Sequence, residues 1–281
     1  MKRFFAAILC SIGLLSALAS CAKRGEAAAP GPVEFVTLQY DSVCPLFRNY
    51  AEPACHITLK LAVPVGAPEL ERTLVTLPRE GALAQDAGGT MEGMARAYLR
   101  QFIFQYLLDG KEAIDSYNGN TEEAGSWMTY EEAVQGVVTF NANGFVCYEY
   151  SIYSFAGGAH GNTQTRTCVF DLRQNRALQL ADLFEPAALG QVADQIRARL
   201  MLDANCTTLE QLAEAGYLDP EGIGPTENFL IDNDGIIWLY DPYEIAPYSM
   251  GEIEVPLPWR DVLPLIKAET PLHELAEMFA I

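Results

Sequence analysis

The residues best placed for chemistry lie in a glycine-rich loop around His160. Residues 157–162 read Gly-Gly-Ala-His-Gly-Asn. Glycines permit backbone angles and close approaches that other residues avoid, and a histidine held there could bind a ligand or exchange a proton. The alternative is a tight connection whose imidazole bonds to the backbone. We favour this structural interpretation and predict no metal or cofactor, because the only other histidines are His56 and His273 and no metal-ligand spacing surrounds His160.

A second unusual block, residues 240–248, reads Tyr-Asp-Pro-Tyr-Glu-Ile-Ala-Pro-Tyr. Its candidate binding residues are Asp241, Tyr243, Glu244 and Tyr248. Tyrosines supply rigid amphipathic contact area, prolines fix the backbone, and carboxylates would attract a cationic partner. The same tyrosines could instead pack against their own sheet as core. The sequence leaves both interpretations open.

The start of the chain predicts a bacterial lipoprotein signal peptide over residues 1–20. Two basic residues precede an apolar run, and Leu18-Ala19-Ser20-Cys21 follows as a lipobox. Lipidation of Cys21 would anchor the protein to a membrane of the cell envelope, on its extracytoplasmic side, through a tether over residues 21–32. A transmembrane anchor is disfavoured, because the run is shorter than the roughly 20 residues that span a bilayer. A plain cleaved signal peptide is the nearer alternative.

The charge balance limits the partners that the chain can take. Asp and Glu number 37 against 18 Lys and Arg, a net charge of −19. Such a surface repels the phosphates of nucleic acid, so no nucleic-acid partner is expected. It would attract a cationic partner, although plain solubility also accounts for it.

The cysteines suggest two disulfides, since an extracytoplasmic compartment is oxidising. Cys44 and Cys55 stand at the two mouths of one loop, which suits a disulfide between them. Cys147 and Cys168 face each other if their two strands pair in one particular register. Cys206 has no assigned partner.

The pattern of elements predicts an α+β fold with antiparallel sheets and packed helices. Helices are expected after Thr90 and ending before Gly110, from Pro186, over 208–215, from Pro258 and from Pro271. Strands are expected over 34–39, 55–63, 137–140, 146–152, 163–171 and 252–255, with a hairpin over 229–240.

Two details of strand pairing follow from the side chains. Setting Cys147 opposite Cys168 also sets Glu149 opposite Arg166, an opposite-charge pair. In the hairpin, the dipeptide Asp234-Gly235 predicts a type I′ turn.

Several of these landmarks together resemble one family of envelope domains. They are the Gly-Gly-Ala-His loop, Phe170-Asp171-Leu172, Leu180-Ala181-Asp182-Leu183-Phe184, Asn228-Phe229-Leu230, Asp234-Gly235, the block Pro242–Tyr248, and Gly251. The pattern, over about residues 137–266, is similar to the extracytoplasmic domain of lysozyme-sensing anti-sigma factors of the RsiV type, which also accompanies peptidoglycan deacetylases of the PdaC type. Residues 33–136 resemble the module that precedes this domain, and residues 137–281 form the second predicted domain.

The resemblance implies an envelope module that binds lysozyme in one relative, which favours a binding module over an enzyme. The chain lacks the deacetylase catalytic motifs and the sigma-binding part, so neither activity carries over. A wall component such as peptidoglycan, or a wall-targeting protein such as lysozyme, which is typically cationic, is the expected partner. The alternatives are an enzyme acting on wall polymer, with His160 and Glu244 as acid and base, and a purely structural lipoprotein.

Overall fold

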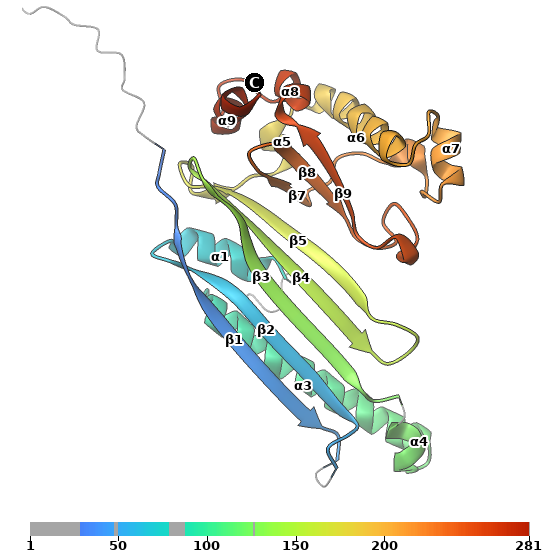
Figure 1. Cartoon of the computed structure of the whole chain (residues 1–281). Coiled ribbons are helices and arrows are strands. Elements are labelled where there is room, and N and C mark those ends of the chain that lie inside the picture. The colour runs from blue at the N-terminus through green and yellow to red at the C-terminus, as the bar shows by residue number, and fades with distance from the viewer. Residues whose placement is uncertain (1–28, 48–49, 79–87, 126, 281) are drawn as a thin grey trace, which may run out of the picture.

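The computed structural model describes residues 29–47, 50–78, 88–125 and 127–280. The predicted signal peptide and Cys21 lie outside these residues. The described chain forms two sheets with helices packed on them, which confirms the α+β prediction (Figure 1). Within the described ranges, no helix is both long enough and apolar enough to span a bilayer.

The larger sheet has six strands in chain order. They are β1 (Glu34–Pro45), β2 (Ala54–Val65), β3 (Tyr130–Ala142), β4 (Phe145–Ala156), β5 (Asn162–Asp171) and β6 (Arg176–Ala177). Neighbouring strands are antiparallel, except that β2 and β3 are parallel. The predicted boundary between residues 136 and 137 falls inside β3, so the two parts share one continuous sheet.

Helices cover one face of this sheet. They are α1 (Pro68–Thr76) and α3 (Met91–Ser116), and the short α4 (Thr121–Gly125) follows α3 and contacts it. Thr90 caps α3 as predicted, because its side chain accepts a hydrogen bond from the N–H of Gly93. The predicted end before Gly110 is wrong. The helix continues through Gly110 because the site is a packing contact: a Cβ there would lie 2.3 Å from a methyl carbon of Leu46.

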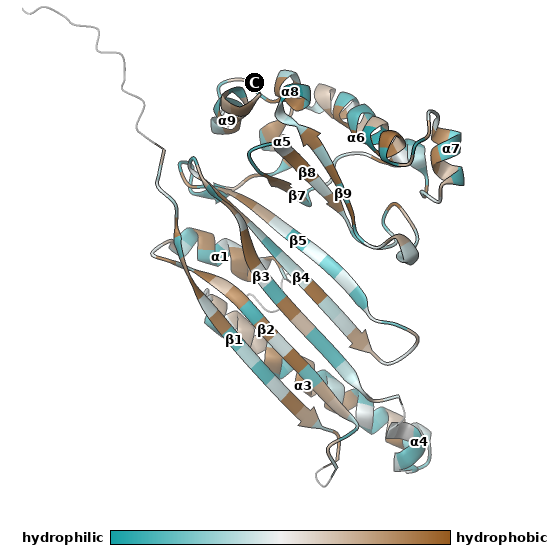
Figure 2. Ribbon diagram, in the orientation of Figure 1, coloured by the Kyte–Doolittle hydropathy of each residue, from teal (hydrophilic) through white to brown (hydrophobic). Residues whose placement is uncertain are grey.

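The core between helices and sheet follows the alternation of the strands. Figure 2 shows hydrophobic and hydrophilic residues alternating along β1 to β5. On the helix face, Ile57, Leu59 and Leu61 of β2 pack with Tyr148 and Tyr150 of β4 against α1 and α3. The opposite face of β4 and β5 is therefore left for the second part of the chain.

The second sheet packs on that opposite face. Its strands are β7 (Phe229–Ile231), β8 (Gly235–Tyr240) and β9 (Ile253–Pro258), and its helices are α5 (Leu180–Leu183), α6 (Leu189–Asp203), α7 (Leu209–Glu214), α8 (Trp259–Val262) and α9 (Pro271–Phe279). The predicted helix starts at 186, 208, 258 and 271 are confirmed within a few residues. The thiol of Cys147 donates to the carbonyl of Ile231 at 3.3 Å, which fixes the contact between the two sheets.

The predicted hairpin over 229–240 is present, but its turn is not type I′. No residue of the turn has a positive φ. Instead, the Asp232 carboxylate accepts hydrogen bonds from the N–H groups of Asp234 and Gly235, at 2.7 and 2.9 Å. The turn is therefore stabilised by an aspartate side chain that accepts from nearby backbone N–H groups, and not by the positive φ angles of a type I′ turn.

The predicted register of β4 and β5 is wrong by one residue. Cys147 lies opposite Val169, and Cys168 lies opposite Tyr148. Because side chains alternate between faces, a one-residue shift puts Cys147 and Cys168 on opposite faces of the sheet, in separate cores. The predicted disulfide between them therefore does not fit this register. Burial raises the pKa of the Cys168 thiol to about 12, so it is an inert core residue.

Cys44 and Cys55 do stand directly opposite each other on β1 and β2, at the mouth of their loop. Both are thiols in this structure, and burial with the neighbouring Cys44 raises the pKa of Cys55 to about 11. We predict that they join under oxidising conditions, which would stabilise the protein by roughly 2–3 kcal/mol. Peptide mapping without reductant should recover the peptide that contains Cys44 and the peptide that contains Cys55 as one linked species. Two alkylated single peptides, or Cys206 linked to either residue, would contradict the prediction.

Candidate functional site

The candidate site is built around the free edge of β5. This edge is open from Asn162 to Cys168, since β6 pairs with Phe170 and Asp171 and the N–H of Leu178 donates to the carbonyl of Val169. An open edge leaves backbone N–H and C=O groups without a neighbouring strand. Side chains of the second part of the chain take that place here.

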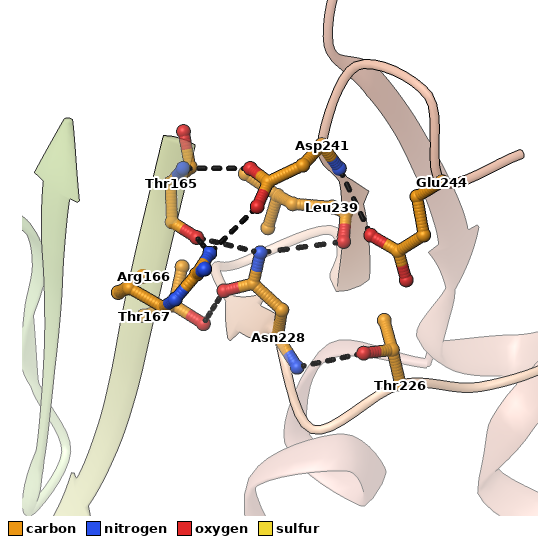
Figure 3. A network of polar contacts seen from close by, with 8 residues as sticks. All are labelled: Thr165, Arg166, Thr167, Thr226, Asn228, Leu239, Asp241 and Glu244. Atoms are coloured by element: carbon orange, nitrogen blue, oxygen red, sulfur yellow. Dashed lines mark hydrogen bonds and ion pairs between the residues drawn. The ribbon is translucent and has the colours of Figure 1, made fainter. Parts of the chain in front are cut away.

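Asp241, which follows β8 directly, holds the edge at one residue (Figure 3). One carboxylate oxygen accepts from the buried N–H of Thr165 at 2.7 Å, and the other accepts from Arg166 at 2.6 Å. Asp241 thus binds a strand edge and a cation together. The sequence predicts Asp241 as a residue of an exposed binding surface, whereas in the structure its carboxylate holds the β5 edge.

Asn228 completes this polar clamp, which we define as Asp241, Asn228, Arg166 and Thr165. Its amide group donates to the carbonyl of Thr165 at 3.1 Å and also lies 3.4 Å from the carbonyl of Leu239 (Figure 3). Its side-chain oxygen accepts from the Thr167 hydroxyl at 3.0 Å. Two side chains therefore act as a short substitute strand that joins the two sheets.

The chain between β8 and β9 folds back over the β5 edge. The Asp241 N–H donates to Glu244 at 3.0 Å, and the N–H of Tyr243 donates to the carbonyl of Ala246 at 3.0 Å. Tyr243 takes a φ of +72°, a backbone conformation that is costly for a bulky residue. The loop therefore holds Tyr243 in a costly backbone conformation while the Tyr243 ring is exposed.

The structure brings the two sequence blocks together in one aromatic stack. The rings of His160 and Tyr248 stack with centroids 4.1 Å apart, and those of Tyr248 and Tyr243 stack at 5.7 Å. The carbonyl of Gly161 accepts from the Tyr248 hydroxyl at 2.8 Å and lies 2.9 Å from Nδ1 of His160. We call His160, Tyr248 and Tyr243 the aromatic stack.

Particular backbone angles and close neighbours explain the glycines of the His160 loop. Gly157 and Gly158 adopt φ values of +77° and +103°, which glycine tolerates best. A Cβ on Gly157 would also lie 2.6 Å from the backbone carbonyl oxygen of Trp127, and one on Gly161 would displace the ring of Tyr153, which lies 2.4 Å away. His160 bonds to its own loop backbone, as the structural interpretation expects, and its ring also carries the stack.

Exposure separates the two tyrosines that the sequence left ambiguous. Tyr243 is 57 % exposed, so it is a surface residue, whereas Tyr248 is half-buried and braces the His160 loop. The core interpretation is therefore wrong for Tyr243 and partly right for Tyr248. Tyr243 is the aromatic side chain that a partner can contact.

An acidic groove of about 550 Å³ adjoins the aromatic stack. It lies between the outer face of β4 and β5 and the loop after β8, with Tyr248, Met250, Glu149 and Glu252 among its lining residues. Burial raises the pKa of both glutamates, and their mutual repulsion with Glu254 adds to the shift. Carboxylates held together in this way gain most from a cationic neighbour.

A larger groove of about 1040 Å³ runs on the other side of the clamp, between the end of α1 and the second sheet. Glu244 lines it, and burial raises the pKa of this carboxyl group. His160 instead stacks on Tyr248, so His160 and Glu244 do not line this groove together. The acid–base pair required by the enzyme alternative thus gains no support from the geometry.

Metal binding finds no support in the described residues. Within residues 29–47, 50–78, 88–125 and 127–280, no group of three or more His, Cys, Asp or Glu side chains could hold an ion.

Sequence reasoning missed Glu149, Glu252 and Asn228. Glu149 was expected opposite Arg166, but it lies opposite Thr167 and faces the groove. Asn228 was noted only as a landmark of the resemblance, and no local pattern indicates its role, because its partners Thr165 and Thr167 are more than sixty residues away in the chain.

Comparison with known proteins gives a family model and a fold. Residues 181–260 match the model described as "Protein of unknown function (DUF3298)". A DUF3298 family structure from Bacteroides fragilis is similar at 26 % identity and a TM-score of 0.77, covering 88 % of this chain and 98 % of its own. One from Pseudomonas aeruginosa shares the fold at 21 % identity and a TM-score of 0.60, covering 86 % and 96 %. None of the curated proteins matches the chain.

The matched residues 181–260 include Asn228, Asp241 and the tyrosines of the aromatic stack, but not His160 or Glu149. The candidate site thus combines the matched segment with the β4–β5 hairpin.

Proposed function

We propose that the chain is a lipid-anchored, extracytoplasmic binding module that captures a cationic wall-targeting protein of the lysozyme kind. The observation that carries this proposal is the exposed Tyr243 ring, held by the aromatic stack next to the acidic groove. A rigid exposed aromatic side chain beside carboxylates is the composition of a protein-binding surface with a basic partner.

The rigidity of the loop supports this function. Its prolines and hydrogen bonds fix the loop before binding, so little conformational entropy is lost when a partner docks. The net charge of −19 would also speed the approach of a cationic protein. The resemblance to the RsiV-type domain, in which a relative binds lysozyme, points to the same partner.

A pull-down with lysozyme tests the proposal. We expect the double variant Tyr243→Ala, Tyr248→Ala to lose most of the binding of the unsubstituted chain, roughly tenfold or more, since buried aromatic contacts dominate interfaces. The matched control is Tyr50→Ala, which removes another exposed tyrosine (68 % exposed) from the loop between β1 and β2. Circular dichroism checks that each variant is folded.

Each outcome bears on the proposal. Equal lysozyme binding by a folded double variant and by the control would remove the aromatic stack from the site. Retention of wall fragments but not of lysozyme would favour a wall component as the ligand. Binding that does not weaken as salt rises would contradict the role of the acidic groove.

The envelope location has its own test. We expect Cys21→Ala to release the protein from membranes or leave the precursor unprocessed, because the lipobox cysteine is the acylated residue. Membrane fractionation of cells grown with and without globomycin measures both the processing of the precursor and its retention in membranes. Unchanged processing and membrane retention would contradict lipidation at this residue.

A further inference from the structure

One residue of the β5 edge stays open beside the polar clamp, where the edge faces the larger groove of about 1040 Å³. Along an antiparallel strand, the N–H and C=O groups of alternate residues point to the same edge. Thr165 directs both groups outward to side chains of the clamp, and Val169 directs its C=O outward to the N–H of Leu178. Thr167 lies midway between them, so its N–H and C=O also point away from β4.

The backbone of Thr167 is sheltered and still lacks a neighbouring strand. Thr167 is only 8 % exposed, and its hydroxyl is bonded to Asn228, as Figure 3 shows. Among the described residues of the second part of the chain, none bonds its N–H or C=O. A ligand that meets both groups must offer one acceptor and one donor at the spacing of a paired strand. One residue of an extended peptide supplies both.

The neighbours of Thr167 limit the length of such a ligand. The clamp already occupies Thr165, and Leu178 already occupies the C=O of Val169. Only one residue of a ligand can therefore pair with this part of the edge, which excludes a long strand such as β1 of a second copy. The groove volume is at the upper end of ligand pockets, roughly 300–1,000 Å³, and gives room for a short peptide.

The charges that line the groove select basic side chains. The guanidinium of Arg166 is already paired with Asp241 at 2.6 Å. Glu227 and Glu244 also line the groove and accept only backbone N–H groups, at 2.9 and 3.0 Å. Neither of these carboxylates forms an ion pair among the described residues, so a basic side chain of a ligand would gain from both.

We propose that the larger groove binds a short basic peptide segment in extended form, which pairs with the β5 edge at Thr167. Its basic side chains would lie near Glu227 and Glu244. Backbone pairing supplies affinity and the carboxylates supply selectivity, as in other sites that add a strand to a sheet edge. The groove lies on the other side of the clamp from the acidic groove, and the proposal does not depend on the capture of a wall-targeting protein.

Amide hydrogen exchange, measured by NMR on the full chain, tests the backbone pairing. The probe is acetyl-Lys-Val-Lys-amide at millimolar concentration and low salt. We expect exchange of the Thr167 N–H to slow at least fivefold near saturation, because the peptide C=O accepts from it. The Thr163 N–H is the matched control, since it belongs to the same edge but lies at the acidic groove. Equal slowing of both, or of neither, would overturn the proposal.

Singly N-methylated forms of the probe separate backbone pairing from binding by side chains alone. In an extended peptide, N–H groups alternate between the paired edge and the opposite side. Methylation of the N–H that meets Thr167 should weaken binding at least tenfold, whereas methylation of the next N–H should be tolerated. Equal affinity of all three methylated forms would contradict strand pairing. Protection of Thr167 by tetra-N-acetylchitotetraose and not by the peptide would replace the peptide with a saccharide.

A charge-removing double variant tests the selectivity. Glutamine keeps an oxygen for the backbone N–H groups, so Glu227→Gln, Glu244→Gln should stay folded and bind the basic probe at least fivefold more weakly. The matched control is Glu214→Gln, an exposed residue of α7 outside the groove. Acetyl-Glu-Val-Glu-amide should bind the unsubstituted chain more weakly than the basic probe. Equal affinity for the two probes, or equal effects of the two variants, would contradict the role of the carboxylates.

Discussion

Replacing Gly235 by alanine should lower the free energy of unfolding by about 3 kcal/mol, because the β8–β9 pair has no room for a side chain there. An added Cβ would lie 1.9 Å from the carbonyl oxygen of Leu257 and 3.0 Å from the Cα of Pro258. Both neighbours are backbone, so relief requires the two strands to separate. Urea unfolding followed by tryptophan fluorescence would measure the loss as a lower midpoint.

The matched control is Gly190→Ala, since Gly190 lies in α6 with no atom within 4 Å of the added Cβ. Alanine favours helices over glycine, so this variant should keep the unfolding free energy or raise it by up to about 1 kcal/mol. If Gly235→Ala were as stable as Gly190→Ala, the close approach of the two strands would be wrong.

The second large effect is expected for Asp241→Ala. It leaves the buried N–H of Thr165 without an acceptor and Arg166 without its ion pair, so we expect a loss of about 2 kcal/mol. Asp241→Asn should lose less, since its side-chain oxygen can still accept from Thr165. As a control, Asp115→Ala removes an exposed ion pair with Lys111 within α3 and should change stability by less than about 0.5 kcal/mol.

A double-mutant cycle tests whether the clamp acts as one unit. Asn228 and Asp241 bind the C=O and the N–H of the same residue, Thr165. The combined variant Asn228→Ala, Asp241→Ala should therefore cost less than the sum of the single variants. Additive losses would mean that the two side chains hold the β5 edge independently.

Helix starts could be predicted from the sequence, because a cap is a local feature. Thr90 and Thr208 both accept hydrogen bonds at the starts of their helices, at the positions the sequence indicates. The end of α3 could not be predicted. Gly110 normally favours a helix end, but here it makes space for Leu46, which lies more than sixty residues earlier in the chain.

Strand register was harder to predict, because a register that pairs opposite charges can differ from the register that buries the most hydrophobic area. The pair of Glu149 and Arg166 favoured a register that is shifted by one residue. In the structure, burying Tyr148, Tyr150 and Cys168 on one face decides the register, and Arg166 reaches round the edge to Asp241. Hydrophobic area outweighs a single surface ion pair.

The candidate site was predicted in its parts and not in its assembly. His160 and Tyr248 were both selected, but the hydrogen bond that joins their loops spans 87 residues of chain. No local pattern reports such a contact. The acidic groove depends on the same assembly, since Glu149 belongs to β4 and Glu252 to the loop before β9.

The single parallel pairing of the large sheet has a consequence for the order of folding. The β1–β2 hairpin and the β3–β4–β5 meander each close over short loops, whereas β2 meets β3 only after the chain from Val65 to Tyr130 has crossed over. Closing so long a loop is slow. Until it closes, β2 and β3 each present a free edge with apolar residues such as Leu59 and Val134. Misassembly between chains is therefore expected to compete at this step, and the yield of correctly refolded protein should fall as protein concentration rises.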